Sequence, residues 1–236
     1  MISTKWYTNR TTFINIITRK SAERGSHTDL RLGYGSYNTL EAEATHRTNL
    51  GRFTSTVTAS YNRSDGHREN MDYEQMGGMA RLGYDLGREW SISADINITH
   101  FNASNPGSIS SPIIDNDSRI TRGASSIALR NAHGALSLFH NWGVHRINDG
   151  YSPGGTPLDY RFRSKDAITG AMLYQSFSLF EGNRTMVGVD YRHFGGKALN
   201  RYLNGDPDKI IADSFFRNAV FFIKLPPKNF SIFTRF

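Results

Sequence analysis

The chain has 236 residues, a length that suits one large or two small domains; 38% of the residues are hydrophobic and 12% aromatic, and the formal net charge is +7. It contains no cysteine, which excludes disulfides, zinc–thiolate sites and thiol nucleophiles. It also contains no apolar run of about 18 residues, which excludes a transmembrane helix.

Positive charge is spread along the whole chain. A nucleic-acid-binding domain gathers its lysines and arginines on one face or one element. Here the arginines are dispersed, for example at Arg10, Arg31, Arg63, Arg81, Arg122, Arg163 and Arg201. We therefore expect no nucleic-acid partner.

Apolar and polar residues alternate over most of the sequence. From Trp90 to Ile98 every second residue is apolar, and Ser91, Ser93 and Asp95 are among the polar residues between them. This period of two predicts half-buried β-strands, about ten along the chain. The predicted strands are 28–48, 52–62, 75–86, 89–101, 120–131, 134–146, 166–180, 184–194, 213–225 and 229–236.

Short and long connections alternate between these strands. The predicted short connections are 49–52, 86–89, 132–134, 181–183 and 226–228. The predicted long connections are 63–74, 102–119, 147–165 and 195–212. In an antiparallel meander, alternate connections lie at the same end of the sheet, so this order predicts short turns on one rim and long loops on the other.

These features together predict an all-β, antiparallel up-and-down meander that forms a partial transmembrane β-barrel. Sorted loops, and strands longer than the usual five or six residues, are typical of outer-membrane barrels. A low mean hydropathy of −0.50 is compatible with such a barrel, because only alternate residues contact lipid. The apolar side of 90–98 is then expected to face lipid and the polar side a lumen. A soluble, sugar-binding β-sandwich is a rival, but it would need two inward apolar faces and unsorted loops.

Several stretches resemble TonB-dependent outer-membrane receptors. INIITRK at 14–20 is similar to the last strand of their plug domain, and LRLGYGSYNTLEAEATH at 30–46 to their first barrel strand. Later stretches resemble successive barrel strands and loops: YNRSDGHREN, ARLGYDLGREWSISADINITHFNASNPG, DNDSRITRG, NWGVHRINDGYSPG, DYRFRSKD and GVDYRHFGG. The resemblance extends over about residues 12–200.

The resemblance implies a function and a location. Such receptors have a plug followed by a barrel of about 22 strands in the outer membrane of Gram-negative bacteria. They bind a scarce solute, such as an iron chelate, cobalamin or a glycan, and use energy transmitted by TonB to move the plug. The expected partners are therefore outer-membrane lipid, a small-molecule or glycan cargo and, through the plug, TonB. We therefore expect that the chain is not an enzyme and that it needs no cofactor.

The sequence also departs from the family pattern. Residues 1–11 do not resemble plug sequence and stay unassigned, 12–27 look like a remnant of the plug and linker, and 28–236 look like part of the barrel. The plug proper and its TonB-contact segment are missing, and no signal peptide is visible at the N-terminus. We expect a receptor fragment that forms an open curved sheet, with residues 12–20 displaced or loosely packed on its concave side, and that is not transport-competent alone. Phe230, Ile232 and Phe236 resemble a terminal insertion signal, although chance explains them equally well.

The sequence shows no motif for metal or covalent chemistry. The eight histidines are scattered and none has the spacing of HExxH, so no metal site is expected. GSIS and GASS lack the second glycine of a nucleophile elbow. GYGSYNTLE lacks the third glycine and the helix of a dinucleotide site.

The strongest candidate for cargo binding is loop 145–165, which is rich in Asp, Asn, Tyr, Arg and Gly. Loop 102–119 has a similar composition. The candidate cargo-facing residues are Tyr151, Asp159, Tyr160, Arg161 and Arg163. The alternative is a small closed barrel enzyme with a hydrolytic site at the outer rim, for which His145, Asp149 and Asp159 would have to converge.

Overall fold

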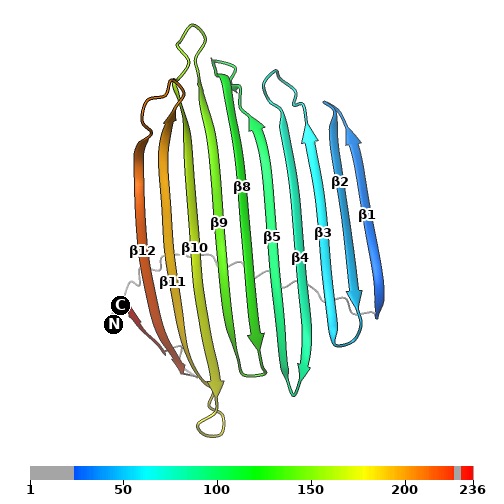
Figure 1. Ribbon diagram of the computed structural model, residues 1–236. Coiled ribbons are helices and arrows are strands. Elements are labelled where there is room, and N and C mark those ends of the chain that lie inside the picture. Colours follow the sequence, from blue (N-terminus) through cyan, green and yellow to red (C-terminus); the bar gives the residue numbers. More distant parts are fainter. Residues whose placement is uncertain (1–23, 226–229, 236) are drawn as a thin grey trace, which may run out of the picture.

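The computed structural model describes residues 24–225 and 230–235, with side chains described over residues 24–221 (Figure 1). This part of the chain is built entirely from β-strands and turns, and it holds no helix that could cross a membrane. The strands are β1 (Gly25–Gly35), β2 (Thr39–Asn49), β3 (Phe53–Ser64), β4 (Tyr73–Gly87), β5 (Trp90–Ser104), β6 (Gly107–Ser108), β7 (Ser111–Pro112), β8 (Ile114–Arg130), β9 (Gly134–Tyr151), β10 (Tyr160–Phe177), β11 (Thr185–Tyr202), β12 (Lys209–Leu225) and β13 (Phe230–Arg235).

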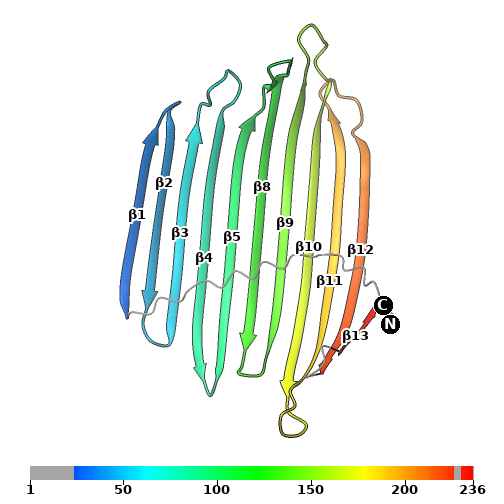
Figure 2. The same ribbon diagram turned by 180° about the vertical axis from the view of Figure 1, so that it is seen from behind.

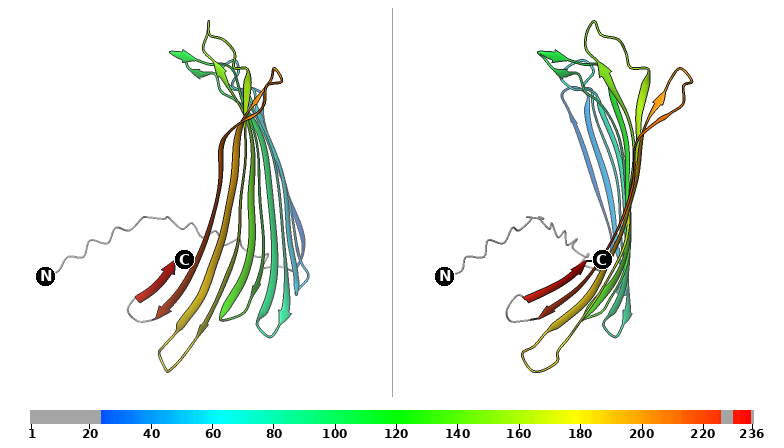
Figure 3. Two further views of the ribbon diagram at one scale, coloured as in Figure 1. Left: turned by 60° about the vertical axis from the view of Figure 1, so that its left-hand side comes forward. Right: turned by 90° about the vertical axis from the view of Figure 1, so that its left-hand side faces the viewer.

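One large sheet contains eleven of these strands in the order β1-β2-β3-β4-β5-β8-β9-β10-β11-β12-β13. Every neighbouring pair is antiparallel, so the sheet is an up-and-down meander (Figures 1 and 2). β1 pairs only with β2 and β13 only with β12, so the sheet does not close into a barrel. Figure 3 shows a curved single layer. The expected all-β meander with an open curved sheet is confirmed.

The prediction of a single strand over 28–48 was wrong, because the chain reverses direction near the middle of this segment. β1 and β2 form a hairpin, and the Thr39 amide donates to the Ser36 carbonyl at 3.2 Å. Tyr37 and Asn38 both have positive φ, 58° and 55°, which is the conformation of a type I′ hairpin turn. The alternation of apolar residues continues across this turn, so the period of two does not reveal it.

The strands next to the long loops extend further than the hydrophobic pattern predicted. β9, β10 and β11 each have 18 residues. The predicted loop 147–165 therefore shrinks to 152–159, and 195–212 shrinks to 203–208. These added ends carry charged residues such as Arg161, Arg163 and Lys197 on the face that is apolar in the rest of the strands, so the apolar period ends before the strands do.

The loops are still sorted between the two rims, with two exceptions. The long-loop rim carries 65–72, 105–113, 152–159 and 203–208, and the short-turn rim carries 50–52, 88–89 and 131–133. The tight turn at 36–38 lies on the long-loop rim, and the longer connection 178–184 lies on the short-turn rim. Loop 105–113 contains the small β6–β7 hairpin.

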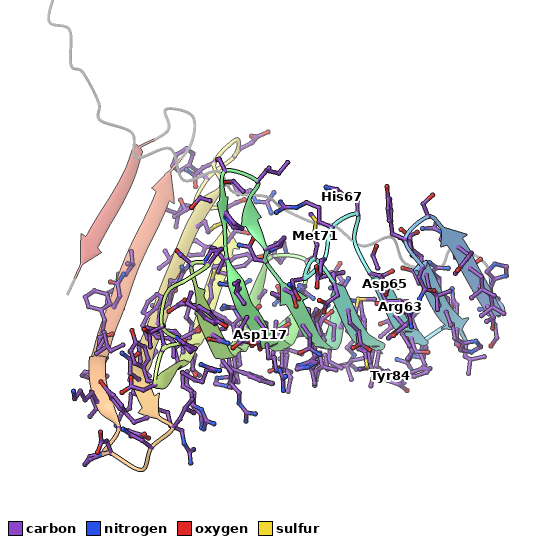
Figure 4. All side chains as sticks on the ribbon, turned by 90° about the horizontal axis from the view of Figure 1, so that it is seen from above. Arg63, Asp65, His67, Met71, Tyr84 and Asp117 are labelled. Atoms are coloured by element: carbon purple, nitrogen blue, oxygen red, sulfur yellow. The ribbon has the colours of Figure 1, made fainter. Side chains whose placement is uncertain are left out.

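The two faces of the sheet differ in chemistry. Tyr84, Ile92 and Leu129 occupy one cross-strand row on one face of the sheet, which we call the outer face. Arg81 and Asp95 are opposed on the other face, which we call the inner face. Outer-face hydrophobic side chains are well exposed, and the fully buried hydrophobic residues among those described are the two alanines Ala128 and Ala135. In Figure 4, Tyr84 lies on the outer side of the curved sheet. The described sheet therefore has no hydrophobic core of its own.

One close approach on the outer face depends on a glycine. A Cβ at Gly123 would stand 2.3 Å from the Trp142 ring on the neighbouring strand. Gly78 occupies the same cross-strand row, and a Cβ there would meet nothing within 4 Å. The indole of Trp142 therefore lies over β8 only because position 123 has no side chain.

The β1–β2 hairpin can be tested with a disulfide, since the chain has no native cysteine. We expect Leu32→Cys with Ala42→Cys to oxidise rapidly, because these residues are directly opposed and opposed Cα atoms in antiparallel strands are about 4.5–5.5 Å apart, within disulfide range. A single strand would separate them by about 33 Å. Mass spectrometry under non-reducing conditions measures the bond, and Leu32→Cys with Thr48→Cys is the mismatched control. Equal oxidation of both pairs would contradict the hairpin.

A glycine substitution tests the Trp142 contact. Gly123→Val should displace the indole and lower the free energy of unfolding by about 1–3 kcal/mol through overpacking. Gly78→Val is the matched control and should leave both the stability and the tryptophan emission unchanged. Emission spectra and denaturant titrations of the full chain in lipid measure the two effects. An unshifted emission in Gly123→Val would show that the indole lies elsewhere.

Candidate functional site

Ion pairs on the inner face form both between neighbouring strands and within one strand. The guanidinium of Arg81 on β4 bonds the carboxylate of Asp95 on β5, which also accepts from the Ser126 hydroxyl on β8 at 3.1 Å. Arg192 donates two hydrogen bonds to Asp190 on its own strand, at 3.0 and 2.8 Å. The inner face thus carries charges that are paired within the sheet.

The densest polar cluster lies on the inner face of β8, β9 and β10. Arg122 donates to the Asp166 carboxylate at 3.1 Å and to Nε2 of His145 at 3.1 Å. Nδ1 of His145 is 2.8 Å from the Ser164 hydroxyl. The cluster is open to solvent: the Arg122 side chain is 55% exposed and that of Asp166 39%.

This cluster contains a serine, a histidine and an aspartate, but its hydrogen bonds do not suit nucleophilic catalysis. An arginine only donates, so Nε2 of His145 accepts and Nδ1 carries the proton that points to Ser164. In this arrangement His145 has no free lone pair with which to take the Ser164 proton. The Asp166 carboxylate is 3.9 Å from Nε2, too far for an orienting hydrogen bond.

The three residues that a rim hydrolase would need, His145, Asp149 and Asp159, are not within hydrogen-bond or ion-pair distance of one another. His145 contacts Ser164, Arg122 and Asp166 rather than Asp149 or Asp159. Within the described ranges, no group of three His, Asp or Glu side chains could hold a metal ion. The chemistry that the inner face offers is therefore hydrogen bonding and charge recognition.

Aromatic pairs line the inner face near the long-loop rim. The Tyr160 and Tyr202 rings on β10 and β11 are 5.7 Å apart, and Tyr73 and Phe101 on β4 and β5 are 6.3 Å apart. The Lys209 ammonium stands 4.8 Å from the centre of the Tyr202 ring. A hydrogen bond to Tyr202 and the charge of that group raise the pKa of Lys209 above its usual value, so this lysine stays cationic at neutral pH.

Hydrogen bonds connect the elements of the long-loop rim to one another. The Asn38 side-chain amide donates to the Asp65 carboxylate at 3.1 Å, which joins the first turn to loop 65–72. The Arg68 guanidinium donates to the Gly107 carbonyl at 2.8 Å, which joins that loop to the β6–β7 hairpin. In Figure 4, His67 and Met71 of loop 65–72 lie toward the inner side of the sheet. The loops thus form a connected border above the inner face.

The structure separates the five residues predicted to contact cargo. Tyr151 ends β9, Asp159 precedes β10, and Tyr160, Arg161 and Arg163 belong to β10, so four of the five are in strands and only Asp159 is in a loop. Tyr160 shares the inner face with Tyr202, whereas the register places Arg161 and Arg163 on the outer face. Their role in cargo binding stays a prediction.

Sequence reasoning missed Tyr202, Lys209, Tyr73 and Phe101. These residues lie far from loop 145–165 in the sequence, and only the strand register brings two of them to Tyr160. Phe101 lies at the end of the predicted strand 89–101, where an aromatic strand end was a usable signal. Tyr73, Tyr202 and Lys209 lie in the predicted loops 63–74 and 195–212, so the hydrophobic period gave no signal for them.

The fold resembles that of solved receptors. The crystal structure of the siderophore receptor PiuA from Acinetobacter baumannii matches with a TM-score of 0.57 and 10% sequence identity, over 86% of this chain and 40% of that chain. The alcaligin outer-membrane receptor FauA from Bordetella pertussis matches at 14% identity, over 87% of this chain and 42% of that one, with a TM-score of 0.34. No family model and no curated protein matches the sequence.

The chain therefore spans about two fifths of the length of the solved structures it matches. At 10% identity, the likeness to PiuA establishes a shared fold. The open meander thus has the fold of part of the PiuA structure.

Proposed function

We propose that this chain forms a sector of the barrel wall of a TonB-dependent receptor in the outer membrane of a Gram-negative bacterium, where it takes part in the uptake of a scarce solute. The outer face contacts lipid and the inner face lines the lumen. The long-loop rim faces outward from the cell and forms part of the cargo vestibule.

One observation carries the proposal, which is the exposure of large hydrophobic side chains on a single face. Leu32 is 80% exposed, Ile96 47% and Leu138 50%. A soluble monomer rarely exposes contiguous apolar surface on this scale, whereas lipid is the natural solvent for it. Strands of 11 to 18 residues reach the length of about 9–11 that a tilted strand needs to cross a bilayer.

The two free edges favour a larger assembly. An unpaired strand edge leaves N–H and C=O groups without partners, and each such group is costly in hydrocarbon. We infer that β1 and the opposite edge pair with further strands of the same receptor, and that this sector alone does not transport. TonB would act through a plug domain. The predicted plug remnant is 12–27, and its residues 12–23 lie outside the residues that the structure describes.

We propose an iron chelate as the cargo, in preference to cobalamin or a glycan, because PiuA is a siderophore receptor. The aromatic pair Tyr160–Tyr202 and the cationic Lys209 offer ring stacking and positive charge, both of which suit an aromatic, anionic chelate. Tyr151 and Asp159, at the mouth of the same loop, would add further contacts.

Single-cysteine labelling tests the membrane assignment. We expect a solvent-sensitive fluorophore on Ile96→Cys, in vesicles that hold the full-length protein, to emit at shorter wavelength and to resist quenching by iodide. The same fluorophore on Asn97→Cys should be quenched, because its side chain points to the lumen. Ile109→Cys is the water-exposed control. Equal quenching at positions 96 and 97 would contradict a lipid-facing outer surface.

Alanine substitutions test the cargo site. Tyr160→Ala with Tyr202→Ala should weaken the binding of ferric catecholate and ferric hydroxamate chelates by about 30-fold, since two aromatic contacts at a recognition site contribute on the order of 1 kcal/mol each. Radiolabelled iron retained by outer membranes that contain the full-length protein measures the effect. Tyr191→Ala, on the outer face, is the control and should bind normally. Retention of labelled cobalamin, with no retention of either chelate, would show that the cargo class is wrong.

A further inference from the structure

Cationic side chains gather on the outer face of β8 to β11, beside the long-loop rim. Arg119, Arg146 and Arg163 occupy directly opposed positions on three consecutive strands. In the next row toward the short-turn rim, Lys165 is opposite Lys197. The basic patch comprises Arg119, Arg146, Arg161, Arg163, Lys165, Lys197 and Arg201.

Like charges directly opposed across two strands destabilise a sheet unless an anion separates them. Two members of the patch have an acidic partner: Arg119 is 3.5 Å from the Asp117 carboxylate, and Arg161 is 3.4 Å from that of Asp115. Within the described side chains no carboxylate lies at ion-pair distance from the others, which are Arg146, Arg163, Lys165, Lys197 and Arg201. Asp213 is opposite Lys197 in the register without forming an ion pair with it.

On the inner face, Arg81, Arg122 and Arg192 each have an aspartate within hydrogen-bond distance. Cations without a carboxylate at ion-pair distance also occur singly among the described residues, at Arg31, Arg130 and Lys209 on the inner face and at Arg217 on the outer face. The basic patch differs because five such cations lie in adjacent cross-strand rows on the face that we assign to lipid. An anion from outside the protein would neutralise them.

A groove of about 510 Å³ lies on the same face, immediately next to Lys165 and Lys197. Cross-strand pairing aligns Trp142, Ala167, Gly195 and Phe215 in one row, so two large rings flank two small residues. The small residues form the floor of the groove. Its walls are apolar, and its end toward the long-loop rim carries the two lysines together with the carboxylate of Asp213. The net charge of that end is positive, and an apolar groove with a cationic end matches the amphipathic pattern of a single lipid molecule.

We propose that this surface binds a phosphorylated lipid of the outer leaflet, with a phosphate of the headgroup between Lys165 and Lys197 and an acyl chain in the groove between Trp142 and Phe215. The inference rests on the proposed function, because it needs the outer face to contact a membrane. Lysine and arginine suit phosphate through charge and multiple hydrogen bonds. The acyl chain gains apolar contact that a free phosphate ion could not provide.

Quenching of Trp142 by brominated lipids tests the proposal. The full chain, carrying Trp6→Phe and Trp90→Phe so that Trp142 is the sole tryptophan, is reconstituted with phosphatidic acid or phosphatidylcholine brominated on the acyl chain. We expect half-maximal quenching at a mole fraction about 25-fold lower for the phosphatidic acid. Lys165→Gln with Lys197→Gln should remove this preference, because each lysine contributes a factor of about five to it.

Two further variants serve as controls. Arg31→Gln with Arg88→Gln removes the same charge from the inner face and the short-turn rim, and should keep the preference. Gly195→Val should reduce quenching by both lipids, because it narrows the groove; a Cβ at 195 meets only the His193 ring at 4.0 Å, so the strand accommodates it.

The outcomes separate this inference from the proposed function. If neither lipid quenches Trp142, the membrane assignment itself fails. If both lipids quench equally, or if Lys165→Gln with Lys197→Gln keeps the preference, the outer face contacts lipid but the headgroup site is wrong. Loss of the preference on adding an equimolar amount of inorganic phosphate would indicate a free-anion site and would also overturn the proposal.

Discussion

The structure depends on a single constraint, which is that the described sheet is one layer thick. Its backbone hydrogen bonds are satisfied between neighbouring strands, but no second layer covers either face. Each face must therefore contact a solvent that suits its own side chains. Rows such as Ile92 with Leu129 on one side, and Arg81 with Asp95 on the other, cannot both be stable in water at this scale. An apolar medium outside and an aqueous lumen inside satisfy both faces at once.

The same constraint explains why charges are treated differently on the two faces. In an aqueous lumen an exposed ion pair contributes little to stability, so pairs such as Arg122–Asp166 and Arg192–Asp190 mainly fix side-chain positions and limit net charge. If the outer face contacts lipid, as we propose, a cation there needs an anion of its own. Arg146 and Arg163 lie next to each other without one in the described sheet, and phosphate groups at the membrane surface are the nearest source.

Sequence alone could predict the faces but not the limits of the strands. The alternation from Trp90 to Ile98 identified the outer face correctly, because a period of two follows directly from strand geometry. The hairpin turn at Tyr37 and Asn38 was missed, since it contains neither glycine nor proline and leaves the period intact. The sequence could not assign the predicted cargo residues to one face: Arg161 and Arg163 were grouped with Tyr160 by their position in the sequence, but adjacent residues of a strand point to opposite faces.

Strand length links the fold to the proposed recognition. β9 and β10 have 18 residues each, whereas a tilted strand crosses the bilayer with about 9–11. The remainder of each strand extends past the apolar belt toward the long-loop rim. Because side chains alternate along it, this extension presents Tyr160 to the inside and Arg161 and Arg163 to the outside. Under the proposed function, this strand end contacts cargo on one face and lipid headgroups on the other, and a shift of register by one residue would exchange the two surfaces.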